Sequence, residues 1–508
     1  MRCQETCQGV PRQNRGAETV NPRLALATAS ALAFGLLTTE PARASGLEAP
    51  DLGVQALGRG AAFTARADDG MAVLYNVGGF AQQRGTKLTL STNVAFSDAR
   101  FARAGKYLDN ARDPATPWGG KNYPVVGSTG GPAVIPSLVV SSDFGLDRWT
   151  FAAAFFTPSP AGGGTFPLGV ANGVPNPARY MALSTSGLVA FPTAAASYRV
   201  TDSLDVGLAA HLVVVRVDSY SVSYFDFDPG TCKNAEYQPC DALSRVQTEG
   251  SGGAASIGAL YRVSDTWHVG LNLRSGFSAD TTGTVQANAP KILSASSPPA
   301  EIQVSLSMPW IARFGVRHII KTGKFETADI EVNGTYEAWS SASKTRVFIP
   351  KLGDFKNVDQ SIDNGYTDAG SLRVGGAYNL PALGGIGTLR AGAFYDASAV
   401  PVSRIRPGQA ALDKLGLTVG AGLEVGAIRL NVAYAAVLSP EVEVKNGDII
   451  LTNAARQGVS RSADDKPYGA VNNGTYSAQT HIVSFGAEVA FDKLFAKDPP
   501  KAKTPEDT

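Results

Sequence analysis

The stretch LDVGLAAHLVV (204–214) places an apolar residue at every second position. Leu204, Val206 and Leu208 share one face of an extended chain, and most of the residues between them are small or polar. Because side chains alternate between the two faces of a β-strand, this pattern predicts a strand that is apolar on one side. The same alternation runs through LTLSTNVAF (88–96) and WTFAAAFF (149–156).

Comparable runs along the chain predict fourteen strands, separated by gaps that are alternately short and long. They lie near 87–96, 134–143, 148–157, 187–199, 203–216, 253–263, 267–277, 301–317, 326–338, 370–379, 387–397, 415–425, 427–437 and 480–491. Strands of about 10 residues with short turns at one end and long loops at the other are typical of bacterial outer-membrane barrels. A soluble sandwich or propeller would share the period of two but not the alternating loop lengths. The sequence therefore predicts an all-β fold, a membrane β-barrel of about 14 antiparallel strands with both chain ends in the periplasm.

Aromatic residues fall at both ends of the predicted strands, as in the interfacial girdles of membrane barrels. The periplasmic set is Tyr198, Tyr261, Trp267, Tyr378 and Phe491, and the opposite set is Tyr336, Trp339 and Tyr395.

The N-terminal segment resembles an export signal. An uncharged, mostly apolar run covers 24–37, and the small-x-small sequence Ala42-Arg43-Ala44 follows it. The run is shorter than the ~20 residues of a spanning helix, which disfavours a membrane anchor. We therefore expect a signal peptide at 1–44, a small-residue segment at 45–86, the barrel at 87–491 and a disordered periplasmic tail at 492–508.

Two cysteines, Cys232 and Cys240, remain in the exported chain and lie close together in TCKNAEYQPCD (231–241). In an exported protein such a pair predicts a local disulfide, and no further ligands nearby favour a metal site. The net charge of +1 gives no reason to expect a nucleic-acid partner.

The small-residue segment lacks strand alternation and suits a plug, or hatch, inside a barrel that would otherwise be an open pore. Its sequence ALGRGAAFTARADDGMAVLYNVGGF (56–80) resembles the N-terminal hatch of the FadL/TodX (OMPP1) family of outer-membrane transporters. The residues that carry the resemblance are Asp68, Asp69, Tyr75, Asn76 and Gly79. Val77, Gly78 and Phe80 stand where the family has Pro, Ala and Leu. Later stretches, TYEAWS (335–340), SLRVGGAYNL (371–380) and LRAGAFYDASAVP (389–401), extend the resemblance over nearly all the exported chain.

The resemblance implies passive uptake of hydrophobic small molecules, with long-chain fatty acids favoured. It also implies capture at the extracellular loops, an inner pocket and sideways exit through a break in the barrel wall. An aromatic or alkane hydrocarbon channel remains an alternative, and an adhesin or structural barrel is a third. We expect contacts with outer-membrane lipid, a monomer and no cofactor or metal. The chain has no Gly-x-Ser-x-Gly elbow and its four histidines are dispersed, so no enzyme is expected.

Candidate ligand-binding residues follow from these expectations. Two long loops carry aromatic, aliphatic and cationic side chains suited to capture an amphipathic acid, although the aromatics could equally pack loop against loop. They are Tyr220, Tyr224, Phe225 and Phe227, with Lys291, Ile292 and Leu293.

Strand alternation predicts which charged residues face the lumen, and these include both acidic and basic side chains. The inward set is Arg313, Arg317, Asp329, Glu331, Arg373, Arg390, Asp396, Glu424, Arg429 and Glu488. We expect most of these to form ion pairs that hold the hatch, since unpaired buried charge is costly. One arginine, Arg373 or Arg390, could instead bind a carboxylate. Pro136, Pro158 and Pro192 are candidates for the wall break, because proline removes a ladder hydrogen bond.

Overall fold

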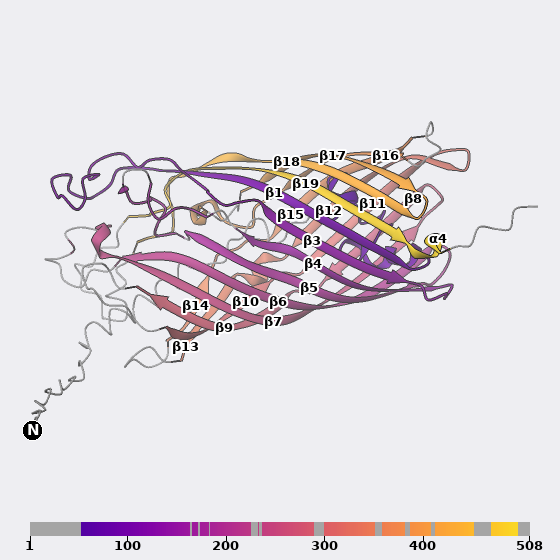
Figure 1. Ribbon diagram of the computed structural model, residues 1–508, viewed down its shortest axis with the longest axis horizontal. Helices are drawn as coiled ribbons and strands as arrows, with labels where there is room; N and C mark the ends of the chain where they lie inside the picture. The colour runs from indigo at the N-terminus through magenta and orange to yellow at the C-terminus, as the bar shows by residue number, and fades with distance from the viewer. Residues whose placement is uncertain are drawn as a thin grey trace, which may run out of the picture.

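The computed structural model describes residues 52–162, 165–170, 173–181, 183–224, 232, 236–288, 299–350, 358–380, 387–407, 412–451 and 469–495. Over these residues the chain forms a closed antiparallel β-barrel of 14 strand positions, which confirms the predicted fold class (Figure 1). No helix within the described ranges is long and apolar enough to cross a membrane.

Most barrel positions are single long strands, and four are built from two consecutive pieces. The single strands are β1 (Lys87–Arg103), β3 (Ala133–Ser142), β4 (Trp149–Gly162), β5 (Ser184–Arg199), β6 (Leu204–Tyr224), β7 (Asp241–Arg262), β16 (Gly387–Asp396), β17 (Lys414–Val425), β18 (Ile428–Val444) and β19 (Gly474–Ala490). The paired pieces are β8 (Trp267–Arg274) with β9 (Phe277–Ala287), β10 (Ala300–Met308) with β11 (Ile311–Thr322), β12 (Phe325–Glu337) with β13 (Lys344–Ile349), and β14 (Val358–Asp363) with β15 (Ala369–Asn379). A short β2 (Val126–Gly127) adds to β1.

The barrel closes between its first and last strands, which pair without interruption from Lys87↔Ala490 to Arg103↔Gly474. Turns such as 426–427 and 323–324 lie at one end, which we name the short-turn end. The connections at the opposite, long-loop end are all longer, for example 104–125 and 445–473. The predicted alternation of loop lengths is thus present in the structure.

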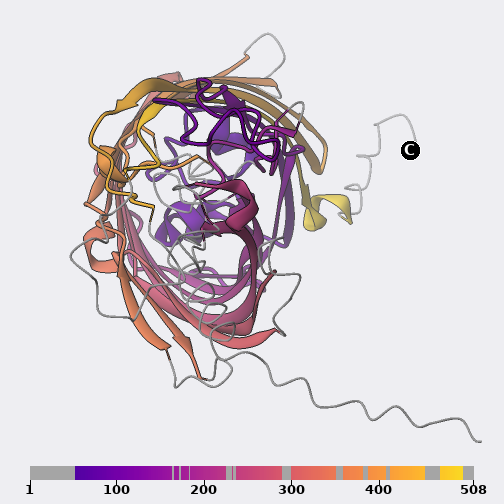
Figure 2. The ribbon, with the colours of Figure 1, turned by 90° about the vertical axis from the view of Figure 1, so that its left-hand side faces the viewer.

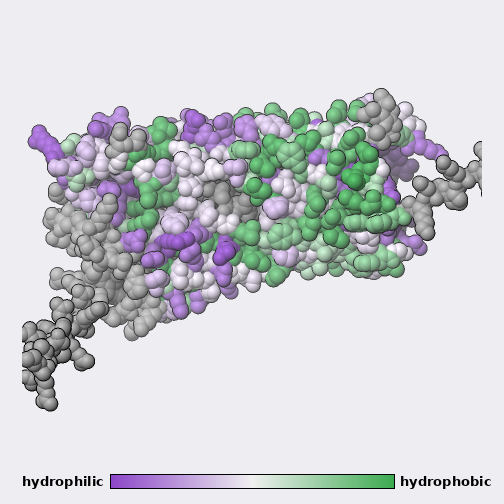
Figure 3. All heavy atoms as spheres, in the orientation of Figure 1, coloured by the Kyte–Doolittle hydropathy of each residue, from purple (hydrophilic) through white to green (hydrophobic). Residues whose placement is uncertain are grey.

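The outer face of the barrel is apolar over the half nearer the short-turn end (Figure 3). Leu208, Leu271 and Leu372 point outward with 62, 52 and 61% of their surface exposed, while alternate residues on the same strands are buried. Toward the long-loop end the surface becomes hydrophilic. An apolar belt beside a polar zone matches a barrel whose strands continue beyond the lipid.

Several predicted strands are too short, because membrane thickness bounds only the part of a strand inside the lipid. β6 and β7 form a hairpin of continuous pairing out to Tyr224↔Asp241, well past the predicted ends at 216 and 253. The predicted strand at 301–317 is wrong as a single element, since it divides into β10 and β11 around Pro309 and Trp310. The hairpin of β13 and β14 at the long-loop end was not predicted.

One predicted girdle residue is also wrong. Trp339 lies in the 3-10 helix η5 (Trp339–Ala342), is 1% exposed, and donates its indole N–H to Glu337 Oε2 at 2.7 Å. Tyr336 and Tyr395 remain about half exposed on the outer face, at 52 and 45%. At the C-terminal side, residues 492–494 belong to the short helix α4 (Phe491–Leu494) rather than to a tail.

Residues 52–86, which precede β1, lie inside the barrel (Figure 2). They form α2 (Val54–Leu57), α3 (Ala72–Tyr75) and the 3-10 helix η1 (Val77–Gln82), and from 52 to 81 every residue except Asp68 is buried. We call residues 52–86 the hatch. The predicted signal peptide lies outside the described residues.

Candidate functional site

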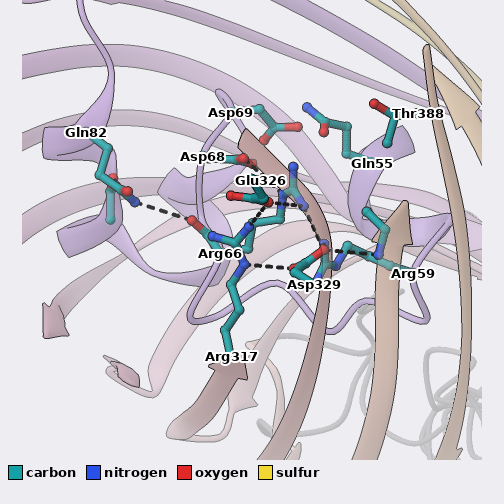
Figure 4. Close-up of polar contacts among 12 residues, drawn as sticks. Gln55, Arg59, Arg66, Asp68, Asp69, Gln82, Arg317, Glu326, Asp329 and Thr388 are labelled. Atoms are coloured by element: carbon teal, nitrogen blue, oxygen red, sulfur yellow. Dashed lines mark hydrogen bonds and ion pairs between the residues drawn. The ribbon is translucent and has the colours of Figure 1, made fainter. Parts of the chain in front are cut away.

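The hatch is fixed to the wall by a cluster of buried ion pairs that centres on Asp329 of β12 (Figure 4). Arg59 Nη2 and Arg66 Nη1 of the hatch donate to Asp329 at 2.6 and 2.9 Å, and Arg317 Nε of β11 donates at 2.7 Å. Glu331, two residues along β12, accepts the backbone N–H groups of Ala65 and Arg66 at 2.7 and 3.1 Å. We name Arg59, Arg66, Arg317, Asp329 and Glu331 the latch.

Strand alternation explains the latch geometry. Asp329 and Glu331 occupy consecutive inward positions of β12, and Ile330 between them points outward with 49% exposure. The side chains of both acids are fully buried. Together they accept hydrogen bonds from arginines and backbone N–H groups of the hatch and from Arg317 of β11. Buried charge of this kind is stable only when paired and hydrogen-bonded, which is the arrangement here.

The hatch backbone also lies directly against the wall where glycines remove side chains. A Cβ on Gly375 would come within 1.9 Å of the carbonyl oxygen of Arg59, and one on Gly392 within 2.4 Å of Gly60 N. Gly60 itself has a positive φ of 65°. The run SLRVGGAYNL (371–380) therefore owes its glycine at 375 to a close approach by the hatch.

The hatch residues predicted from the resemblance have structural roles in this fold. Tyr75 Oη donates to Leu52 O at 2.9 Å, and Asp69 accepts the N–H of Met71 at 2.8 Å. Asn76 caps η1 through Gly78 N and donates to Ala259 O of β7 at 2.9 Å. Asp68 accepts Arg66 Nε at 2.9 Å, and Gly79 leaves room for Ala67.

The two arginines proposed from sequence as carboxylate ligands differ in their surroundings. Arg373 Nη2 donates to Asp396 at 2.6 Å and its guanidinium lies 4.8 Å from the centre of the Phe394 ring. Arg390 instead donates to two neutral amides, Gln55 Oε1 at 2.9 Å and Asn431 Oδ1 at 3.0 Å. Parity therefore placed both residues correctly on the inner face but could not tell them apart.

Beyond the hatch, toward the long-loop end, the interior becomes aromatic. Phe156 of β4 stacks on Phe191 of β5 at 5.7 Å between ring centres, and Phe277 meets Phe191 edge-on at the same distance. His211 of β6 packs edge-on against both Phe156 and Phe191, at 6.1 and 5.9 Å. We name Phe156, Phe191, His211 and Phe277 the aromatic cluster. All four side chains are buried.

A buried cation lies at this cluster. Arg274, the last residue of β8, is 2% exposed, and its guanidinium carbon is 5.5 Å from the centre of the Phe191 ring. Sequence reasoning missed this residue and the cluster. The signal was present in WHVGLNLR (267–274), where Leu271 and Leu273 alternate outward and so direct Arg274 into the lumen.

The wall is interrupted beside the aromatic cluster. β3 and β4 pair from Ser142↔Phe151 to Ser137↔Phe156 and no further, although both strands continue toward the long-loop end. β4 then shifts register against β5 between Phe156 and Ser159. The carbonyl of Pro136 accepts the hydroxyl of Thr157 at 3.3 Å, in place of a ladder partner from β4. Of the prolines considered from sequence, Pro136 and Pro158 lie at this interruption.

The predicted loop residues are only partly described. Tyr220 and Tyr224 belong to β6 rather than to a loop, which corrects the prediction, because the strand continues its alternation to residue 224. Tyr224 is completely buried. Phe225, Phe227, Lys291, Ile292 and Leu293 lie outside the described residues.

A disulfide joins Cys232 and Cys240, with 6.1 Å between their Cα atoms. Between the two cysteines, Glu236 accepts Arg103 Nη2 and Nη1 of β1 at 2.5 and 2.9 Å. Nearby, Tyr107 donates to Pro175 O at 2.6 Å, and burial raises the pKa of this tyrosine to about 12. The disulfide thus lies beside an ion pair that ties β1 to the loop between β6 and β7.

Comparison of the chain with known families gives one match of nearly full length. The profile of the outer membrane protein transport proteins (OMPP1/FadL/TodX) matches residues 35–491. No curated protein sequence matches the chain.

Solved structures share the fold at low sequence identity. A Pseudomonas aeruginosa FadL homologue superposes with a TM-score of 0.66 at 17% identity, covering 86% of this chain and 98% of that one. The toluene transporter TbuX of Ralstonia pickettii gives 0.60 at 16% identity, with 86 and 98% coverage. The toluene transporter TodX of Pseudomonas putida gives 0.58 at 16% identity, with 88 and 98% coverage.

Proposed function

The chain belongs to the OMPP1/FadL/TodX family of outer-membrane transporters of hydrophobic compounds, and from this premise we propose that it takes up long-chain fatty acids by passive diffusion. The observation that carries the proposal is the buried Arg274 at the aromatic cluster, beside the interruption between β3 and β4. Apolar rings suit an acyl chain, which gains about 25 cal/mol for each Å² removed from water. A guanidinium suits a carboxylate, which it can bind through two hydrogen bonds.

In this proposal the interruption between β3 and β4 provides the sideways route from the aromatic cluster to the lipid. Beyond Ser137, toward the long-loop end, the main chain of β3, including Pro136, is not paired with β4. A solute held against Phe156 would leave the lumen there without passing the latch. Both chain termini and the short turns would then face the periplasm, as in the proposal from sequence.

Uptake of aromatic hydrocarbons is the second candidate. The rings of the cluster pack in stacked and edge-on arrangements 5.7–6.1 Å apart, and an aromatic solute could pack against them in the same two arrangements. Two of the similar solved structures are toluene transporters by description. On this alternative the charge of Arg274 is not needed for uptake.

The test is uptake of labelled oleate, oleyl alcohol and toluene by cells without their own hydrophobic transporter, with and without this gene. We expect oleate uptake to rise most, and Arg274→Gln to lower it at least tenfold, since one charge-assisted hydrogen bond contributes about 1.5–3 kcal/mol and about 1.4 kcal/mol is a factor of ten. Arg346→Gln, at an exposed pair with Asp359 on the β13–β14 hairpin, is the control and should change nothing.

Each alternative has its own signature in this assay. Toluene uptake that survives Arg274→Gln, with little oleate uptake, would favour the hydrocarbon channel. No uptake of any of the three compounds by folded protein would overturn transport and favour a surface-binding barrel.

A further inference from the structure

A polar cavity lies at the short-turn end of the lumen, on the other side of the hatch from the aromatic cluster. It has a volume of about 240 Å³, and its lining includes Gln55 of the hatch, Thr388 and Arg390 of β16, and Gly422 of β17. The acids Asp68, Glu326 and Glu424 line it too, beside Arg66 and Arg429. Phe325 and Leu423 also line it, and both flank tight turns of the short-turn end with 39 and 43% exposure. Gln55 and Thr388 appear together beside the latch in Figure 4.

Arg390 is the cation at this cavity that has no acidic partner among the described residues. Its side chain is 6% exposed, its Nη atoms donate to the neutral oxygens of Gln55 and Asn431, and its Nε is buried without an acceptor. The other two arginines of the lining are paired, Arg66 with Asp68 and Asp329, and Arg429 with Glu424. A buried charge held only by amides is costly unless an anion completes it.

The backbone around Arg390 leaves space for its guanidinium. A Cβ on Gly422 would lie 2.9 Å from Arg390 Nη1 and 2.6 Å from Asn431 Oδ1. A side chain at position 422 would therefore push the guanidinium out of its present place. The guanidinium of Arg390 is held by Asn431 of the barrel wall and by Gln55 of the hatch.

From these observations we infer that Arg390, with Gln55 and Gly422, forms a carboxylate-binding site at the short-turn end of the lumen. The guanidinium binds the carboxylate through its unsatisfied Nε and one Nη, and Phe325 covers the first carbons of the tail. A volume of 240 Å³ is below the ~300–1,000 Å³ of sites for drug-sized ligands, so the site takes a short acid or only the head of a long one.

The inference differs in place from the proposed function and does not require it. The aromatic cluster and the wall interruption lie near β3, β4 and β5, whereas Arg390 lies on β16, toward the short-turn end. A carboxylate here would compete with Gln55 for Arg390 and so loosen α2 from β16. Ligand binding at this site would thus weaken a contact between the hatch and the barrel wall.

The experiment uses the purified full-length protein in detergent and isothermal titration calorimetry with octanoate as the probe. Octanol is the uncharged match. We expect octanoate to bind in preference to octanol, Arg390→Gln to weaken octanoate binding at least tenfold, and Gly422→Ala to weaken it severalfold. Arg390→Lys keeps the charge without the planar fork and should retain part of the affinity.

Two controls separate this site from the rest of the molecule. Arg346→Gln removes an exposed arginine at the long-loop end, and Gly334→Ala adds a methyl group where nothing lies within 4 Å. Both should bind octanoate like the wild type. Equal binding by Arg390→Gln and wild type, or equal binding of octanol and octanoate, would overturn the site. If Arg390→Gln fails to fold, Arg390→Lys and Gly422→Ala decide, and unchanged binding by both overturns it as well.

The uptake assay distinguishes the two proposals. Oleate uptake without octanoate binding at Arg390 would overturn this inference and leave the proposed function in place. Octanoate binding lost in Arg390→Gln, in a protein that raises uptake of neither oleate nor toluene, would support the site and overturn the transport proposal.

Discussion

The latch and the aromatic cluster, in the two halves of the lumen, are held together by different kinds of contact. In the latch, contacts are discrete and charged, with three arginines on one carboxylate. In the aromatic cluster, rings pack against rings and each contact contributes only about 0.5–1.5 kcal/mol beyond area burial. Breaking one buried ion pair by removing a partner costs about 3–5 kcal/mol. The latch is therefore suited to hold the hatch in place, and the aromatic cluster is built from contacts that a hydrophobic solute can replace one at a time.

The largest expected effect comes from removing the shared carboxylate of the latch. Asp329→Asn leaves Arg59, Arg66 and Arg317 without their common partner, and we expect a loss of about 3–5 kcal/mol in the free energy of hatch docking. Limited proteolysis of the hatch and single-channel conductance in planar bilayers should both increase. The exposed pair of Asp359 with Arg346 provides the control, since Asp359→Asn should leave both readouts at the wild-type level. A closed, protease-resistant Asp329→Asn barrel would show that the latch is not what holds the hatch.

The disulfide should act only at the long-loop end. Replacing Cys232 and Cys240 by serine frees a short loop, and the chain-entropy account gives a local loss of about 2–3 kcal/mol. Proteolysis near Glu236 should become faster, while hatch protection stays at the wild-type level. Equal loosening of both halves would mean that the two are mechanically coupled.

A methyl group at the contact between hatch and wall tests how closely the two surfaces fit. Gly375→Ala places a Cβ 1.9 Å from the carbonyl oxygen of Arg59, and we expect a cost of about 1–3 kcal/mol from the forced backbone shift. Gly334→Ala, on the neighbouring strand β12 with open space around it, should be near neutral. Thermal unfolding and hatch proteolysis of the two variants compare them directly, and identical behaviour would contradict the close fit.

The smallest expected effect is a pH response at the long-loop end. Hydrogen bonds from Ser340 and from the hydroxyl of Tyr336 lower the pKa of the exposed Asp368. A carboxyl with a lowered pKa contributes stability above its unfolded pKa, about 3.9, and loses it as the pH falls through the folded value. The protection of the Ser340 amide, measured as its exchange rate relative to that of an unstructured peptide at the same pH, should therefore be high at neutral pH and fall below about pH 4. An exchange rate that is the same in Asp368→Asn and wild type at pH 7 would remove the basis for this prediction.

The barrel could be read from the sequence because strand alternation is local. Leu271 and Leu273 face lipid and Arg274 faces the lumen for the same reason, a period of two that needs no knowledge of the partner strand. The same rule placed Asp329, Glu331, Arg373 and Arg390 on the inner face. The predicted strand lengths were wrong where strands run past the lipid, as in the β6–β7 hairpin, because outside the membrane no fixed thickness limits strand length.

The contacts between inward-facing side chains could be known only from the tertiary structure. Arg373 and Arg390 look alike in sequence, yet one finds Asp396 on the adjacent strand and the other finds only Gln55 and Asn431. Phe156, Phe191 and Phe277 are separated along the chain and become neighbours through barrel closure. The sequence by itself determined the class of fold, the inward and outward faces and the position of the hatch segment, since these depend on short-range periodicity and composition. The pairing of charges and the interruption of the wall depend on register between strands, which is fixed only when the barrel closes.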